Sequence, residues 1–134
     1  MDQVNIEKIL VKAEKEMWSY PEIFQAFKAN GVERYETNVL LHEIKYVGGG
    51  ESFIKKATGD FQALTAATEF NLEKLKLAID QVQKREIDYG HFLAEIAAAG
   101  VSFYRVDMGP RTVTYHGPDR HKYVENIPKV KSKG

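Results

Sequence analysis

The segment YPEIFQAFKANGVERY, residues 20–35, decides the fold because it returns as YGHFLAEIAAAGVSFY at residues 89–104. The two copies begin 69 residues apart (89 minus 20) and align without a gap. Both keep a tyrosine at each end and the same glycine–valine pair. A chance offset would rarely match both the glycines that shape the backbone and the aromatic residues that pack a core. The sequence therefore predicts an internally duplicated unit.

Each copy is typical of two helices followed by strands. Apolar residues recur at three- and four-residue steps from about residue 4 to 17 and again from 72 to 82. Ser19 and Asp88 stand where N-caps of the second helix in each copy belong. Beyond the glycine of each copy the apolar period changes to two, which is typical of strands with one face in water.

The predicted fold class is α+β, with two tandem pseudo-symmetric αα-βββ units whose helices pack on one face of antiparallel meanders. Residues 1–128 form a single domain in this interpretation, with the repeat at 4–56 and 73–125 and a connection at 57–72. Residues 129–134, KVKSKG after Pro128, have too little apolar content to pack, so we expect a flexible basic tail.

Composition limits the classes of function. The chain has 134 residues, of which 43% are hydrophobic and 28% charged, which is ordinary for a soluble domain with a buried core. Membrane insertion is not expected, because no apolar run could span a bilayer. Nineteen basic and nineteen acidic residues cancel, so no nucleic-acid partner is expected. The absence of cysteine and of a secretion signal predicts a cytoplasmic location.

The strand register of the second copy predicts which side chains share a face. If both turns there connect strands through four residues, the face covered by helices carries Tyr104, Val106, Val113, Tyr115 and Val124, with Lys122 at its margin. The opposite face then carries three cross-strand rows: Phe103 with His116 and His121, Arg105 with Thr114 and Tyr123, and Asp107 with Thr112 and Glu125. The candidate residues for binding a ligand or partner are therefore Arg105, Asp107, His116, His121, Tyr123 and Glu125.

These candidates also have plainer interpretations. His116 and His121 would be cross-strand neighbours, which makes them a weak candidate metal pair, but a metal site normally needs a third protein ligand. Arg105 and Asp107 could form an ordinary surface ion pair. The recurring tyrosines are assigned to core packing. No phosphate-binding loop, metal motif or nucleophile elbow stands in the sequence, so we expect no cofactor and no assignable catalytic residue.

Several short motifs in order give the chain a resemblance to a known family. They are GVERYET at residues 31–37, ALT at 63–65, DY at 88–89, VDM at 106–108, TY at 114–115 and VENIP at 124–128. With them the chain resembles the YdfO-like family of small bacterial and prophage-borne proteins of unknown function, often labelled "phage envelope protein". The similarity covers roughly Tyr20 to Pro128. It implies a compact α+β fold and brings no catalytic residues.

Two functional hypotheses follow from the sequence. The preferred one is a non-enzymatic binding or interaction domain, with a regulatory or self-associating role, that acts through the polar strand face of the second unit. The alternative is a small-molecule-binding domain or enzyme with a polar cleft between the two units, lined by Arg105, Asp107, His116 and Tyr123. A concave site would favour the alternative. The free edge strand of each meander also makes a homodimer one expectation.

Overall fold

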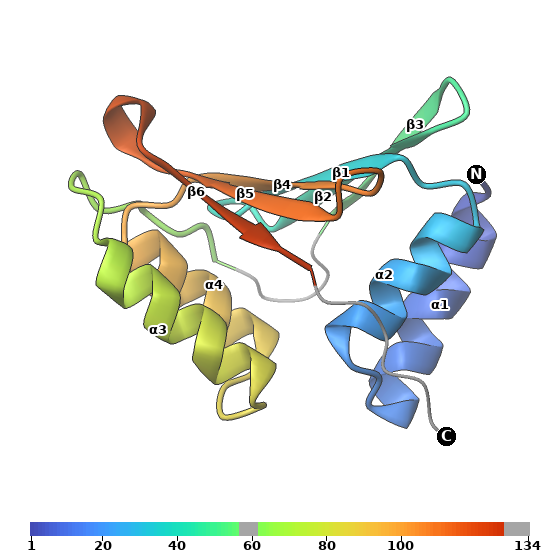
Figure 1. The fold of residues 1–134 in the computed structure, drawn as a ribbon, viewed down its shortest axis with the longest axis horizontal. Coiled ribbons are helices and arrows are strands. Elements are labelled where there is room, and N and C mark those ends of the chain that lie inside the picture. The colour runs from blue at the N-terminus through green and yellow to red at the C-terminus, as the bar shows by residue number, and fades with distance from the viewer. Residues whose placement is uncertain (57–61, 128–134) are drawn as a thin grey trace.

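Four α-helices cover one face of a six-stranded antiparallel sheet in the computed structural model, which describes residues 1–56 and 62–127 (Figure 1). The elements of the first half are α1 (Gln3–Glu16), α2 (Tyr20–Ala29), β1 (Arg34–Asn38), β2 (Glu43–Gly48) and β3 (Glu51–Lys56). Those of the second half are α3 (Leu72–Gln83), α4 (Tyr89–Ala98), β4 (Phe103–Asp107), β5 (Thr112–His116), the short 3₁₀ turn η1 (Pro118–Arg120) and β6 (Lys122–Asn126). The predicted α+β class is confirmed.

The two meanders form one continuous sheet. Its strand order is β3-β2-β1-β4-β5-β6, so β1 and β4 pair at the centre and β3 and β6 are the edges. Glu36 lies opposite Arg105 in the middle of the β1–β4 pair, and these two positions are themselves 69 apart. Joining the meanders in this way places α1 and α2 beneath one half of the sheet and α3 and α4 beneath the other (Figure 1).

The element boundaries keep the spacing found in the sequence. The helices α1 and α3 begin at residues 3 and 72, α2 and α4 at 20 and 89, β1 and β4 at 34 and 103, and β2 and β5 at 43 and 112, each pair 69 apart. By contrast β3 and β6 begin 71 apart, at 51 and 122. That the two halves superpose stays a prediction. The shift of two residues between β3 and β6 limits it to the helices and the first two strands of each half.

Capping groups hold the helix starts where the sequence predicts them. The Asn71 and Asp88 side chains accept the backbone N–H groups of Lys74 and His91, at 3.0 and 2.7 Å. Ser19 donates its hydroxyl to the Glu22 carboxylate at 3.0 Å. Because a cap satisfies N–H groups that the first helical turn leaves unpaired, Asn71 and Asp88 fix where α3 and α4 begin. At the start of α2 the Glu22 carboxylate also accepts the Ser19 backbone N–H at 3.5 Å.

The core lies between the sheet and the helices. Its largest fully buried hydrophobic side chains are Ile6, Phe24, Val39, Tyr46, Leu75, Leu93, Ile96, Val101, Val106 and Met108. In the first half the Phe27 ring meets the Tyr35 and Tyr46 rings edge-on, with centroids 5.7 and 5.6 Å apart. Such pairs add about 0.5–1.5 kcal/mol beyond the area they bury.

The β4–β5 register is confirmed, but the predicted β5–β6 register is wrong. Phe103 pairs with His116 as expected, whereas His116 pairs with Lys122 rather than with His121. The connection contains five residues, 117–121, because η1 adds a turn in which Asp119 and Arg120 adopt left-handed φ values of 54° and 64°. One extra residue turns every β6 side chain to the opposite face of the sheet.

The described part of the connection between the halves runs against both of them. Leu64 donates its N–H to the Leu40 carbonyl at 2.8 Å, and Asn71 donates to the Ala99 carbonyl at 2.8 Å. The Phe70 ring packs so closely to Gly117 that a β-carbon there would lie 2.5 Å from it. Residues 57–61 of the predicted connection and the predicted basic tail at 129–134 lie outside the described residues.

In the described part of the chain, no helix is long and apolar enough to cross a membrane.

Candidate ligand cavity

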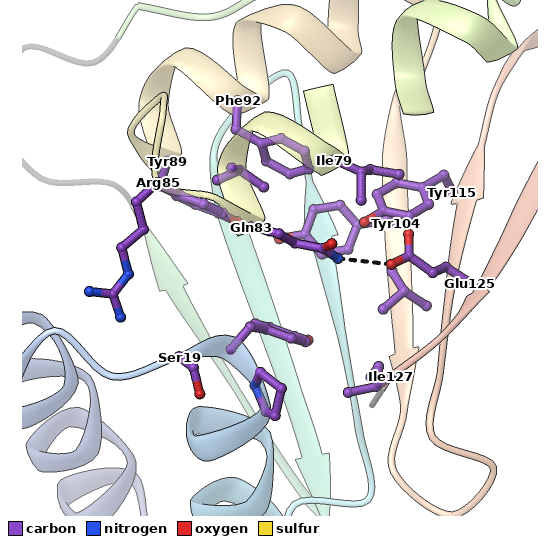
Figure 2. Close-up of a pocket in the computed structure, with 14 residues that line it drawn as sticks. Ser19, Ile79, Gln83, Arg85, Tyr89, Phe92, Tyr104, Tyr115, Glu125 and Ile127 are labelled. Carbon is purple, nitrogen blue, oxygen red and sulfur yellow. Dashed lines mark hydrogen bonds between the residues drawn. The ribbon is translucent and has the colours of Figure 1, made fainter. Parts of the chain in front are cut away.

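A cavity of ≈ 430 Å³ lies beneath the sheet, where the two helix pairs face each other (Figure 2). Its walls come from the starts of α2 and α4, the last turns of α3, and strands β4 to β6. Aromatic and aliphatic side chains make up most of the lining: Tyr20, Tyr89, Phe92, Tyr104 and Tyr115, with Ile79, Val82, Val113, Ile127 and Pro21. Ser19, Gln83, Arg85 and Glu125 are the polar lining residues among those that the structure describes.

Two pairs of tyrosine hydroxyls are formed by residues that line the cavity and their neighbours. The Tyr20 hydroxyl bonds that of Tyr35, and the Tyr89 hydroxyl bonds that of Tyr104 at 2.5 Å, so both copies use the same two positions. Tyr20 and Tyr89 are 37% and 38% exposed. Since their hydroxyls reach buried partners, it is the rings that border the cavity. The sequence assigned these residues to packing alone, whereas in the structure, as the first residues of α2 and α4, they also line the cavity.

Burial keeps the buried phenols neutral. It raises the pKa of every tyrosine in the set formed by Tyr20, Tyr35, Tyr46, Tyr89, Tyr104 and Tyr115. A phenolate is disfavoured there because the charge would leave water. The cavity therefore presents neutral phenols at physiological pH.

The two charged lining residues lie on opposite sides of the cavity (Figure 2). On one side the Gln83 amide donates to Glu125 Oε1 at 2.9 Å. On the other, the Arg85 guanidinium donates to the Met17 carbonyl, which ties the turn after α3 to the turn after α1. The observed β6 register brings Glu125 next to Gln83. The sequence predicted the other register, which would place Glu125 on the opposite face of the sheet.

Three of the predicted site residues, Arg105, Asp107 and His116, lie on the uncovered face of the sheet. Arg105 Nε donates to Asp107 Oδ1 at 3.0 Å, and an Arg105 amino group is 3.8 Å from the Glu36 carboxylate. This is the surface ion pair that the sequence offered as the plainer interpretation. The His116 ring stacks on Phe103 at 4.3 Å. Partial burial, and then the nearby Lys122 ammonium, lower the pKa of His116.

The other three candidates lie elsewhere. His121 stacks on Phe70 at 5.5 Å, so it is not the cross-strand neighbour of His116 and the weak metal pair loses its basis. Tyr123 faces the helices, where its ring packs against Tyr115 and lies 5.5 Å from the Lys76 ammonium. Glu125 lines the cavity. Within residues 1–56 and 62–127, no group of three His, Asp or Glu side chains could hold a metal ion.

A second cavity of ≈ 390 Å³ lies beneath the first half of the sheet and shares Tyr89 with the first cavity. Five of its lining residues are the counterparts, 69 positions earlier, of residues that line the first: Leu10 of Ile79, Ala13 of Val82, Glu14 of Gln83, Ile23 of Phe92, and Ile44 of Val113. Burial lowers the pKa of His42, which also lines this cavity beside the Tyr89 ring.

The charges of the two cavities differ in one respect that the strand register explains. Lys55 lies opposite Ile44 in the β2–β3 pair, and Glu125 lies opposite Val113 in the β5–β6 pair. Because Ile44 and Val113 are counterparts, a lysine in one cavity takes the place of a carboxylate in the other. The walls are thus similar in chemistry, while the charge at this position is reversed.

The comparison with known proteins agrees with the resemblance only at the level of an uncharacterised family. No curated protein matches the chain. One family model matches residues 8–126, which is most of the chain. The chain therefore belongs to the family described as "Protein of unknown function (DUF1398)".

Proposed function

We propose that this domain binds a small organic molecule, without transforming it, in the ≈ 430 Å³ cavity between its two helix pairs. The observation that carries the proposal is the cavity itself. Its size falls in the range of about 300–1,000 Å³ that small-molecule sites occupy, and mostly apolar walls with a small number of polar groups are typical of such sites.

The cavity is partly open to solvent, and it leaves apolar ring surface in contact with water. Covering such surface is favourable, because apolar area is then removed from water. Here the space is bordered by large rings on both sides, Tyr20 and Tyr89 from the helices and Tyr115 from the sheet. A bound molecule would supply the contacts that these rings lack.

The polar groups of the cavity favour binding over catalysis. The Ser19 hydroxyl and its backbone N–H both donate to the Glu22 carboxylate, which serves as part of the α2 cap, and no histidine is among the described residues that line the cavity. The tyrosines are held neutral by burial, so they are suited to hydrogen bonding rather than to proton abstraction.

The test is a cavity-filling variant with a matched control on the same helix. Val82→Trp places an indole in the cavity, whereas Leu77→Trp adds it at a 57% exposed position of α3. Each purified protein is mixed with a metabolite extract, separated from free compounds and examined by native mass spectrometry. We expect the wild type and Leu77→Trp to retain the same bound compound and Val82→Trp to lose it. Retention by Val82→Trp, or no compound on the wild type, would contradict the proposal.

The uncovered sheet face supports a second candidate function, as a surface for a protein partner or another copy of this chain. All four helices of the described chain lie on the opposite face of the sheet (Figure 1). The uncovered face exposes the apolar side chains of Ile54, Phe103 and Val124. Sedimentation of the wild type and of Phe103→Asp over a concentration series tests self-association. A wild-type dimer that the substitution weakens would support it, and monomers throughout would count against it.

The bacterial or prophage origin, the YdfO-like relationship, the phage envelope label and the cytoplasmic location remain predictions from the sequence. Neither candidate function depends on them.

A further inference from the structure

We propose that the ≈ 430 Å³ cavity selects an organic cation, namely an amine carried on an aromatic or other apolar body. This inference rests on the proposed function, since it names the class of molecule that the same cavity binds.

The Glu125 carboxylate provides the recognition. Figure 2 shows its side chain directed toward Gln83 at the border of the cavity. A carboxylate has about four acceptor positions, and in the described structure Glu125 accepts one hydrogen bond, from Gln83, and makes no ion pair. An ammonium group that reaches it would form a charge-assisted hydrogen bond, which is roughly twice as strong as a neutral one.

The positive charge of Arg85 lies on the other side of the cavity from Glu125, so it repels an ammonium group at Glu125 less than a neighbouring charge would. Its guanidinium is bonded to the Met17 carbonyl on the side of the cavity away from Glu125 (Figure 2). The Lys76 ammonium lies over the Tyr123 ring, and Lys76 does not line the cavity. A carboxylate or phosphate placed near Glu125 would meet like charge instead.

The aromatic walls add to the preference for a cation. Phe92, Tyr104 and Tyr115 present neutral rings, and the faces of aromatic rings attract ammonium groups electrostatically. The Tyr20 and Tyr89 hydroxyls are already paired with Tyr35 and Tyr104, which leaves the cavity with fewer donors for an anion.

The second cavity is an internal comparison. Its counterpart walls are apolar too, but Lys55 takes the place of Glu125, and Lys56 and His42 are added. Glu14 brings one negative charge to that lining. An organic cation should therefore prefer the cavity that contains Glu125.

The experiment uses three probes that share one ring system: 2-(2-naphthyl)ethylamine, 2-(2-naphthyl)ethanol and 2-naphthylacetate. Titration calorimetry measures their affinities for the wild type, for Glu125→Gln, and for Glu51→Gln, which changes an exposed carboxylate on the far edge strand β3. We expect the amine to bind the wild type at least about tenfold more tightly than the other two probes. Glu125→Gln should remove most of that preference and Glu51→Gln should keep it. Amide NMR shifts should change around Val113 rather than around Ile44.

The outcomes separate the two proposals. Equal or tighter binding of the alcohol or the acetate by the wild type would overturn the preference for a cation while leaving a binding cavity in place. The same holds if Glu125→Gln keeps the full preference for the amine. If none of the probes binds, the result contradicts both proposals. The wild-type comparison decides the question even if Glu125→Gln does not fold.

Discussion

Replacing Thr37 with valine should stabilise the protein. Thr37 is 0% exposed in the central strand β1, opposite Tyr104, and its Oγ1 has no hydrogen-bond partner among the described residues. The hydroxyl is near those of Tyr89 and Tyr104: burial raises the pKa of both tyrosines, and Thr37 offsets part of each rise. The Thr37 hydroxyl nevertheless has neither tyrosine hydroxyl in hydrogen-bonding geometry, so it is buried and unsatisfied.

The size of the effect follows from that environment. A buried polar group without a partner costs about 1–3 kcal/mol, and valine has nearly the same shape without the polar atom. The counterpart position, 69 residues later, is Val106, which is also 0% exposed, so a valine fits the corresponding place in the second half. We expect Thr37→Val to raise the free energy of unfolding by about 1–2 kcal/mol. With an m value of about 2 kcal/mol/M, the urea midpoint rises by roughly 0.5–1 M.

Urea unfolding followed by far-ultraviolet circular dichroism measures the change. Thr114→Val is the control, because Thr114 lies on the uncovered face of β5, where the effect should stay within about 0.5 kcal/mol. A loss of 1 kcal/mol or more in Thr37→Val would show that the hydroxyl is hydrogen-bonded in the protein, and it would refute the reasoning.

The remaining predictions concern packing and ionisation. Gly48→Ala should destabilise the protein by about 1–3 kcal/mol, since its β-carbon would lie 2.0 Å from a backbone oxygen, whereas Gly109→Ala meets nothing within 4 Å and should be near neutral in the same urea assay. In NMR titrations the pKa of His116 should lie below about 6.5, rise in Lys122→Ala and stay unchanged in His121→Ala; an equal effect of both variants would contradict the register. Because folding favours the neutral His116 imidazole, its contribution to stability is present above about pH 6.5 and is lost as the pH falls through its folded pKa, which urea midpoints measured over that window should show. In Tyr123→Phe, which keeps only the buried tyrosine set, phenolate absorbance at 295 nm should appear only as the protein unfolds in alkali, and stepwise ionisation of the folded protein near pH 10 would contradict their burial.

Much of the fold was predictable because local signals agree with the packing. Caps at Ser19 and Asp88 fix helix starts, and the spacing of 69 residues carries the boundaries of one half to the other. The exception is β6. The stretch 122–125 alternates lysine, tyrosine, valine and glutamate, so one apolar side chain faces each side in either register. The turn before β6 decides between the two registers. In that turn Asp119 and Arg120 adopt left-handed conformations, which usually favour glycine, so the sequence gives no sign of them.

The cavity was not predictable in the same way. It depends on how far apart two helix pairs lie beneath one sheet, and no local pattern records that distance. The pairing of β1 with β4 sets it, together with the contact between Arg85 and the Met17 carbonyl. The sequence did offer a site between the two units, but it assigned Arg105, Asp107 and His116 to that site, and these lie on the opposite face of the sheet.

The most direct test of the central claim, that the cavity beneath the sheet is a ligand site, is a nuclear Overhauser measurement on the complex with 2-(2-naphthyl)ethylamine. The account predicts contacts between naphthyl protons and the ring protons of Phe92 and Tyr115, which line the cavity. Contacts to Phe103 and His116, the stacked pair on the uncovered face, without any to the cavity rings would contradict it.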